Sequence, residues 1–405
     1  MRQISKRQLA DELQLTRAQT LSWIAALRDD QFAVPYDKNS NPPLWELGHI
    51  AWFQEYWCSR QRYVFSQRTA YPKHQPNPSI QRNADALYDS AKVAHQTRWT
   101  LPLPNLQQTK IYCQQTLEQT LIGLEQSPES DDGLYFFRLA LFHEKMHIEA
   151  FAYAWQTLGY AQGAVPESPY RSAPSHADAP LEASDLAIAQ TTFRMGSQSN
   201  NGFVFDNEKW SHGVTVPAYR IQKNLVSYAQ FLAFVKDDGY ARAAFWDADY
   251  FAQLQREKRN MPIYWQLDLM VDAQAQLHTW CFGQLREVVL NDPVAHVSYW
   301  EAQAFCKWAG RTLPTEAQWE YAANTQSSMV WGGQVCEWTS TTFNPYAGFE
   351  ADPYAEYSEP WFGDHQVIKG TSFATPLGLA KAQFRNFFMP QRNDIFVGFR
   401  TCAVA

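Results

Sequence analysis

Four stretches in the first 160 residues carry apolar residues at helical spacing. They are residues 6–29, 44–65, 109–126 and 134–160. Apolar side chains that recur every three to four positions form one face of an amphipathic helix, and such faces bury themselves against each other. Gly159 lies at the end of the last stretch, and glycine is common where helices end. The pattern predicts a four-helix bundle over residues 1–160.

The pattern changes after residue 160. Residues 161–185 are rich in Pro, Ala and Ser and show no periodicity, which is typical of a linker. Over residues 186–405, short strand-like pieces alternate with two helical patches, 227–238 and 298–310, and long loops contain Trp, Gly, Asn and Pro. This pattern predicts a compact α+β domain, so we expect the whole chain to be an α+β multidomain protein.

Composition and charge exclude several classes of function. The 405 residues exceed what one ordinary core needs, which agrees with two domains. The formal net charge is −7 and no basic block occurs, so we expect no nucleic-acid partner. The N-terminus is polar, and no run of about 18 apolar residues occurs, so we expect no signal peptide and no membrane span. The six cysteines are scattered without a CxxC pair, which favours reduced thiols in the cytoplasm. The oligomeric state is not predicted.

Three histidines are candidate metal ligands. His143 and His147 lie four positions apart in "LFHEKMHIEA", so a helix places both imidazoles on one face, about one turn apart. His49 lies early in the second helical stretch among apolar and aromatic residues, where a buried imidazole needs a partner for each ring nitrogen. A shared metal would provide one, and a hydrogen bond to a core carbonyl is the alternative. Three imidazoles without an obvious carboxylate suit Zn, Fe(II) or Cu and leave open coordination positions.

Acidic residues near these histidines have two interpretations. Glu46, Glu144 and Glu149 are either acceptors for imidazole N–H groups or solvated helix charges. In the second half, Glu316 and Glu320 lie at helical spacing and could suggest a catalytic carboxylate pair. We favour a helix start, with Thr315 as the N-cap and Glu316 in the first turn.

The second half carries a recognisable series of motifs. They are FRMGS (193–197), PVAHVSYWEAQAFCKWAGRTLPTEAQWEYAA (293–323), GQVCEWTS (333–340), VIKGTSFA (367–374) and FVGFR (396–400). The series resembles the formylglycine-generating-enzyme, or sulfatase-modifying-factor, domain, and RTLPTEAQWEYAA is its most specific part. The resemblance implies a C-type-lectin-like fold over residues 186–405.

The first half resembles a DinB-like four-helix bundle. LGHIAWFQEYW and HEKMHIEAF are similar to the iron site of the ergothioneine-pathway sulfoxide synthases, which fuse the same two domains in the same order. The resemblance implies that His49, His143 and His147 bind nonheme Fe(II). It also implies that O₂ is used to couple a sulfur or selenium donor to C2 of the imidazole of hercynine, the trimethylammonium form of histidine.

Departures from the family pattern concern the substrate-binding residues. Many members have HEQQH where this chain has HEKMH, so Met146 replaces a glutamine that touches hercynine. The family's RNWD corresponds to RNFF, in which Asn386 and Phe387 would flank the betaine end of hercynine. Phe388 replaces an aspartate that helps to bind γ-glutamylcysteine. An arginine-rich loop of such members is replaced by residues 87–104, whose polar candidates for substrate binding are His95 and Arg98.

These departures bear on the chalcogen donor. A pocket with Phe and Met in place of charged and polar groups should reject a doubly anionic dipeptide, because its charges would be desolvated without partners. Because the segments around the three histidines most resemble the selenoneine synthase branch, we predict a selenoneine synthase that uses a selenosugar. The alternative is a sulfoxide synthase that uses cysteine or γ-glutamylcysteine. The family also uses an active-site tyrosine, for which the candidates here are Tyr354, Tyr346 and Tyr357.

Two other functions stay open at this stage. A formylglycine-generating enzyme needs a reactive cysteine pair, and Cys336 and Cys402 are available, although an isolated cysteine is usually a small core residue. Lectin-like cores and DinB bundles also occur as non-catalytic binding modules, and a DinB-type transferase binds Zn with similar histidines. Ferrous iron, and O₂ consumption that depends on an imidazole substrate, would exclude both.

Overall fold

The computed structural model describes residues 2–60, 76–161, 184–199, 201–268, 276–379 and 381–404. The chain forms two compact units. The first contains the described residues of Met1–Val165, Ser199–Asp206 and Glu350–Glu359. The second contains the described residues of Pro166–Gln198, Asn207–Phe349 and Pro360–Ala405. Most of the predicted linker, 161–185, lies outside the described residues, and the domain boundaries at 160 and 186 stay a prediction.

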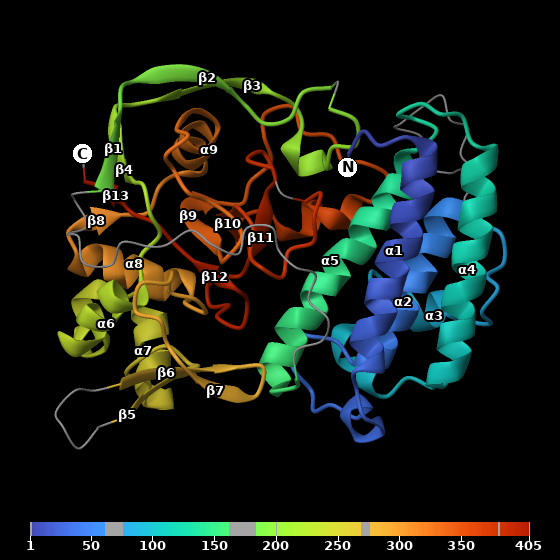
Figure 1. Ribbon diagram of the computed structural model, residues 1–405, viewed down its shortest axis with the longest axis horizontal. Helices are drawn as coiled ribbons and strands as arrows, with labels where there is room; N and C mark the ends of the chain where they lie inside the picture. Colours follow the sequence, from blue (N-terminus) through green and yellow to red (C-terminus); the bar gives the residue numbers. More distant parts are fainter. Residues whose placement is uncertain are drawn as a thin grey trace. The chain divides into compact units, whose positions relative to one another are not determined.

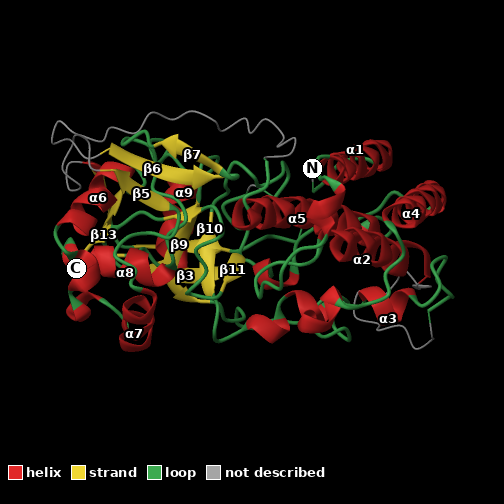
Figure 2. Ribbon diagram, turned by 90° about the horizontal axis from the view of Figure 1, so that it is seen from below, coloured by secondary structure: helices red, strands yellow, loops and turns green. Residues whose placement is uncertain are grey.

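Long helices that lie side by side make up most of the first unit (Figures 1 and 2). They are α1 (Lys6–Ala25), α2 (Pro43–Glu55), α4 (Leu106–Gln126) and α5 (Tyr135–Leu158), with the short α3 (Ala84–Tyr88) before α4. A π-helical turn, Tyr56–Arg60, follows α2, and a 3-10 turn spans His95–Trp99. The predicted helical bundle is confirmed.

Local sequence explains where these helices begin and end. Ser5 and Asn105 cap α1 and α4, because each side chain accepts a hydrogen bond from the backbone N–H three residues later. Pro42 and Pro43 begin α2, at a position where a missing N–H is not needed. Gly159 ends α5 with a φ of 66°, a left-handed conformation that glycine adopts without strain.

A buried ion pair joins α1 to α5. Arg17 and Glu144 have side-chain exposures of 2% each, and two hydrogen bonds of 2.7 and 3.0 Å connect them. Arg17 also donates to the carbonyl oxygen of Cys113 and to Gln54, while the Thr20 hydroxyl donates to Glu144. Because both charged groups have hydrogen-bond partners, the network fixes the position of α5 in the bundle.

The second unit is a mixture of helices and small sheets (Figures 1 and 2). Its helices are α6 (Tyr228–Lys236), α7 (Ala248–Glu257), α8 (Tyr299–Trp308) and α9 (Glu316–Thr325). Its strands are β1 (Asp185–Ile188), β2 (Thr191–Met195), β3 (His212–Val216), β4 (Tyr219–Gln222), β5 (Trp265–Asp268), β6 (Gln276–Cys281), β7 (Gln284–Glu287), β8 (Arg311–Thr312), β9 (Cys336–Thr342), β10 (Gln366–Lys369), β11 (Asn386–Phe388), β12 (Val397–Gly398) and β13 (Cys402–Ala403).

The strands pair in the orders β1-β4-β13-β8, β11-β10-β9-β12 and β5-β6-β7, with β2 paired to β3. β12 runs parallel to β9, whereas β10 pairs antiparallel with both β9 and β11. Strands far apart in the sequence therefore share a sheet, and the predicted α+β class is confirmed. No described helix has the length and apolar character that crossing a membrane requires.

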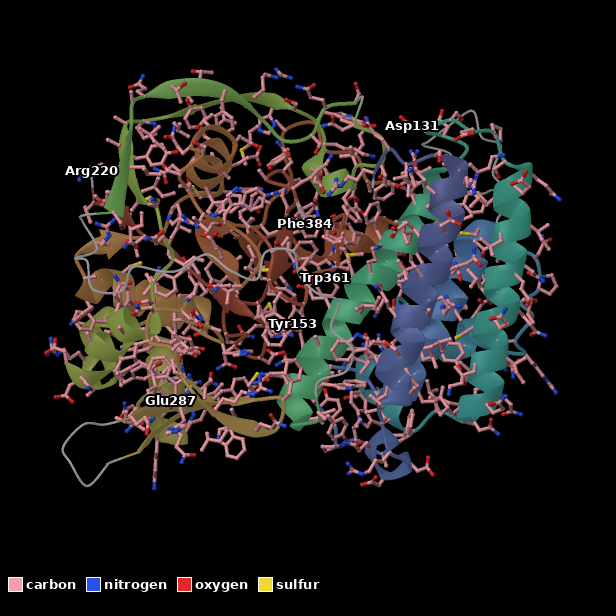
Figure 3. All side chains as sticks on the ribbon, in the orientation of Figure 1. Asp131, Tyr153, Arg220, Glu287, Trp361 and Phe384 are labelled. Carbon is pink, nitrogen blue, oxygen red and sulfur yellow. The ribbon has the colours of Figure 1, made fainter. Side chains whose placement is uncertain are left out.

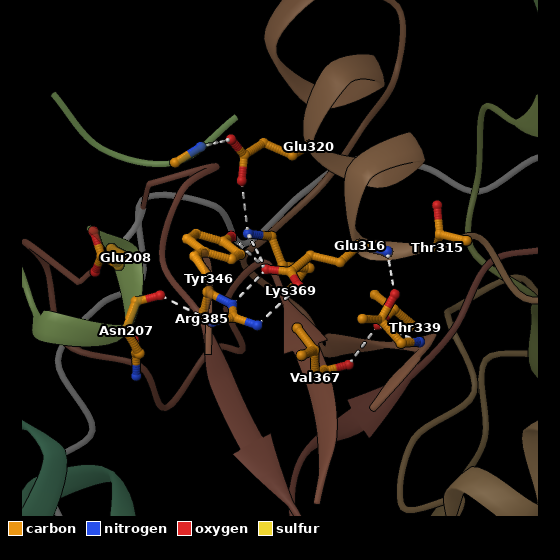
Figure 4. Close-up of polar contacts among 12 residues, drawn as sticks. Asn207, Glu208, Thr315, Glu316, Glu320, Thr339, Tyr346, Val367, Lys369 and Arg385 are labelled. Atoms are coloured by element: carbon orange, nitrogen blue, oxygen red, sulfur yellow. Dashed lines mark hydrogen bonds and ion pairs between the residues drawn. The ribbon is translucent and has the colours of Figure 1, made fainter. Parts of the chain in front are cut away.

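A buried charge network ties α9 to strand β10 and to Arg385, the residue before β11 (Figure 4). Thr315 caps α9 and Glu316 lies in its first turn, as the sequence predicted. Glu316 accepts two hydrogen bonds, of 2.6 and 3.1 Å, from Arg385, and Lys369 donates to Glu320 at 3.1 Å. Both carboxylates thus have buried cationic partners, which supports a structural role for the pair.

Figure 3 draws the side chains of the described residues and labels six of them. Among the labelled residues, Asp131, Arg220 and Glu287 are exposed, while Tyr153 of α5 and Phe384 are buried. This pattern agrees with the segregation of polar and apolar positions along the sequence.

Candidate metal centre

The imidazoles of His49, His143 and His147 converge inside the first unit. One ring nitrogen from each lies within 4.8 Å of the other two. The ring centroids are 5.1, 5.0 and 4.5 Å apart, and the Nε2 atoms of His143 and His147 are 3.2 Å apart. His49 comes from α2, and the other two come from successive turns of α5. Packing of α2 against α5 therefore brings together the three histidines that the sequence singled out.

The three nitrogens fit one metal ion. A metal-bound imidazole nitrogen lies about 2.0–2.1 Å from the ion, so two such nitrogens are at most about 4.2 Å apart, within a small side-chain adjustment of this geometry. His49 and His143 are 2% and 4% exposed. Burial, together with the neighbouring histidines, holds the pKa of each well below 6.5. Both are thus neutral imidazoles, the form that binds metals.

Hydrogen bonds to the outer nitrogens fix how two of the rings face the centre. Nδ1 of His49 donates to the carbonyl oxygen of Tyr88 at 2.8 Å, and Nδ1 of His147 donates to Glu46 Oε1 at 2.7 Å. An N–H at Nδ1 leaves Nε2 with the lone pair, so this nitrogen is the available ligand in both rings. Glu46 is therefore the imidazole acceptor, whereas Glu144 is bound to Arg17.

Aromatic rings cover the imidazole faces. Phe53 stacks on His143 with centroids 3.5 Å apart and an interplanar angle of 3°. Trp45 stacks on His49 at 4.9 Å and 8°, and the guanidinium carbon of Arg98 lies 4.0 Å from the Trp45 centroid. These contacts restrict ring rotation and exclude water from the ring faces.

A segment from the second half of the sequence reaches the histidines. Tyr354 belongs to Glu350–Glu359, which is part of the first unit, and its ring lies 4.9 Å from Phe53 and 6.2 Å from His143. The Tyr135 hydroxyl anchors this segment by donating to Asp352 at 2.7 Å. Burial, aided by the charges of nearby carboxylates, raises the pKa of Tyr354, so the phenol is protonated at neutral pH.

The other two candidate tyrosines have different surroundings. Tyr357 stacks on Phe205 at 4.7 Å in the first unit. Tyr346 lies in the second unit and donates its hydroxyl to Glu316 at 2.9 Å. Geometry therefore favours Tyr354, a choice that no periodicity in the sequence could have made.

The remaining predicted site residues divide between the units. Met146 is half-buried on α5. His95, also in the first unit, is hydrogen-bonded through Nε2 to the carbonyl oxygen of Ser40 at 2.9 Å. Asn386, Phe387 and Phe388 form β11 in the second unit, where Phe387 stacks on Phe343 at 4.0 Å. Substrate contacts by these residues stay a prediction.

The cysteines offer no reactive pair. Cys336 and Cys402 lie on β9 and β13, in different sheets, and both are buried free thiols. Burial raises the pKa of Cys402 to about 12, so it is not a thiolate at neutral pH. This geometry gives no support to formylglycine formation.

The chain matches the sequence profiles of two families. The sulfatase-modifying factor enzyme 1-like domain covers residues 172–332 and 327–405, more than half of the chain. This protein belongs to that family. The DinB superfamily profile matches residues 12–151, so a DinB-like domain precedes the family domain. The domain fusion predicted from the motifs is confirmed.

Three relatives that match nearly the whole chain are named hercynine oxygenase. The Mycolicibacterium smegmatis protein is 28% identical in an alignment that covers 98% of this chain and 99% of the relative. The Mycobacterium tuberculosis protein is 28% identical in an alignment that covers 98% of each chain. A formylglycine-generating enzyme of Thermomonospora curvata is 31% identical over 169 residues, but these cover 37% of this chain and 52% of that protein. The hercynine oxygenases thus match nearly the whole chain, including the histidine-bearing half.

Proposed function

We propose that this protein is a nonheme Fe(II)- and O₂-dependent oxidoreductase that forms a C–Se or C–S bond at C2 of the hercynine imidazole. The convergence of His49, His143 and His147 within 4.8 Å carries this proposal, in a chain whose full-length relatives are named hercynine oxygenase. Ferrous iron, when bound by these three neutral ligands, would supply the activation of O₂. Three ligands leave coordination positions for substrates.

The chain's own residues would bind and orient the substrates. Asn386 and Phe387 would hold the betaine end of hercynine, as the family resemblance implies. Tyr354 lies in ring contact with His143 and stays protonated, so its hydroxyl can give a proton to a group bound beside the histidines. Phe53 and Trp45 keep water from the imidazole faces.

A selenosugar is the donor that we propose. Met146 and Phe388 supply no charge for an anionic peptide. In the loop of residues 87–104, Arg98 already donates to Asn41 at 2.7 Å, and Lys92 is paired with Asp89 at 2.6 Å. A donor with two carboxylates would therefore bury charge without sufficient partners, whereas a neutral sugar would not. Cysteine or γ-glutamylcysteine is the alternative donor.

Anaerobic reconstitution with Fe(II) tests the proposal. The loaded protein is given hercynine, O₂ and, in separate reactions, a selenosugar, cysteine or γ-glutamylcysteine, and products are identified by mass spectrometry. We expect a hercynine–selenium adduct with the selenosugar and no product from His147→Ala. Product from a thiol alone would favour the sulfoxide synthase. Stoichiometric Zn together with inertness to O₂ would favour a non-catalytic binding protein.

A further inference from the structure

Glu46 is a buried carboxylate whose charge the lysines and arginines of the described residues compensate only from beyond ion-pair distance. It lies in the first turn of α2 with 1% of its side chain exposed. It accepts a hydrogen bond from His147 Nδ1 at 2.7 Å, and no lysine or arginine of the described residues forms an ion pair with it. A buried carboxylate with neither an ion-pair partner nor a full set of hydrogen-bond donors is unfavourable, so this environment favours a further positive charge.

Two other buried acids of the bundle each accept several hydrogen bonds from protein groups. Glu144 receives two hydrogen bonds from Arg17. Glu55, also 1% exposed and also on α2, accepts hydrogen bonds from the Ser79 hydroxyl, the Ile80 backbone N–H and the Tyr112 hydroxyl. Glu46 has only the imidazole of His147 as a hydrogen-bond partner, and the Arg98 guanidinium acts on it electrostatically from beyond ion-pair distance. The partial positive charge at the N-terminal turn of α2 stabilises the Glu46 carboxylate in part. No backbone N–H of the described residues donates a hydrogen bond to that carboxylate.

The missing charge would lie on the far side of the His147 ring. Nδ1 of His147 faces Glu46, and Nε2 faces His143 at 3.2 Å, in the cluster of candidate ligands. An imidazole between a carboxylate and a divalent ion is a recurrent arrangement in metalloproteins, where the carboxylate fixes the ring and makes its other nitrogen a stronger donor. The same ion would compensate the buried charge of Glu46.

We propose that Glu46 is a positioning residue for the metal of the proposed function, on which this inference rests. It holds the His147 ring with Nδ1–H outward and Nε2 toward the ion, and it places one negative charge next to the site. His49 is held by the neutral carbonyl of Tyr88 instead. His147 is therefore a stronger electron donor than His49, and the negative charge favours a divalent ion over an empty site.

A purely structural role for Glu46 makes a different prediction. Replacing a buried and incompletely compensated carboxylate by an apolar side chain of similar size should stabilise the metal-free protein, because the desolvation penalty disappears. A positioning role predicts, in addition, that the same substitution weakens metal binding. Glu46→Leu should therefore raise the melting temperature of the metal-free protein and lower its metal affinity.

The test compares Glu46→Gln and Glu46→Leu with the wild type and with Glu55→Gln, a matched buried acid on the same helix. Affinities for Co(II) and Fe(II) are measured anaerobically by chelator competition, and melting temperatures are measured without metal. We expect a loss of about tenfold for Glu46→Gln, which keeps an acceptor oxygen but not the charge, and about a hundredfold for Glu46→Leu. Glu55→Gln should bind metal like the wild type.

Nitrogen NMR of the Zn(II)-loaded protein with labelled histidine gives a second result. The wild type should show the His147 Nδ1–H as a distinct hydrogen-bonded proton, and Glu46→Leu should lose it. If the wild type binds metal and Glu46→Leu binds it with the same affinity, the positioning role of Glu46 is wrong, but the proposed function still stands. A wild type that binds no metal would overturn the proposed function as well.

Discussion

Substitution of Gly48 by alanine tests how α2 positions the first histidine. Gly48 lies in the interior of α2 beside His49, and an added Cβ would lie 2.3 Å from ring atoms of Tyr88 and 2.6 Å from its hydroxyl oxygen. Carbon atoms pack at about 3.5–4.0 Å, so the Tyr88 ring would have to move by more than about 1 Å. Tyr88 is fully buried, and its carbonyl oxygen holds Nδ1 of His49, so this movement would disturb the ligand.

Two opposing effects decide the outcome of Gly48→Ala. Glycine in a helix interior is less favourable than alanine by roughly 0.5–1 kcal/mol, so alanine alone would stabilise the protein. Overpacking in a rigid core costs about 1–3 kcal/mol. This cost is the larger effect when the added Cβ lies 2.3 Å from the Tyr88 ring carbons. We expect a net loss of about 1–2 kcal/mol of unfolding free energy and a metal affinity lowered by about tenfold.

Urea unfolding of the metal-free protein and chelator competition measure the two effects. Gly123→Ala on α4 is the control, because its Cβ would meet Phe137 at 3.7 Å, an ordinary contact. That variant should gain about 0.5–1 kcal/mol and bind metal normally. If Gly48→Ala were as stable as Gly123→Ala, the close approach of Tyr88 to α2 would not exist in the protein.

Three further predictions follow from other parts of the structure. Arg17→Met should lower the unfolding free energy measured in urea by about 3–5 kcal/mol, because it leaves Glu144 buried and unpaired. The double variant Arg17→Met/Glu144→Leu should recover most of that loss. Equal stability of the single and the double variant would contradict this prediction. Tyr354→Phe should retain iron but lower hercynine-dependent product formation by about 10²-fold or more; wild-type turnover would remove Tyr354 from the reaction. Burial lowers the pKa of His296 from 6.5 to about 4. Between these values the unfolded chain binds a proton that the folded protein does not, so stability falls as the pH drops from 6.5 to 4. His296→Asn, which tolerates the φ of 60° there, should show a shallower decline in urea midpoints.

The sequence predicted the features that depend on local spacing. The helices of the first unit appear where apolar residues recur every three to four positions, and Gly159 ends α5 because a left-handed residue is needed there. His143 and His147 share a face because four residues make about one turn. These inferences need no knowledge of distant contacts.

Other features depend on contacts between distant segments and could not be predicted in this way. Glu46 looks like an ordinary first-turn acid, and its burial depends on α5 packing across α2, 101 residues later. Tyr354 reaches the histidines because Asp352 is held by Tyr135, 217 residues away. The cap at Thr315 was predictable, but the cation that pairs with Glu316 is 69 residues away.

The iron retained per chain after desalting tests the central claim most directly. Wild-type protein loaded anaerobically with Fe(II) should keep one iron per chain, and single alanine variants of His49, His143 and His147 should each lose most of it while remaining folded. Wild-type protein without bound iron, or variants that keep a full equivalent, would contradict the assignment of these imidazoles as the metal ligands.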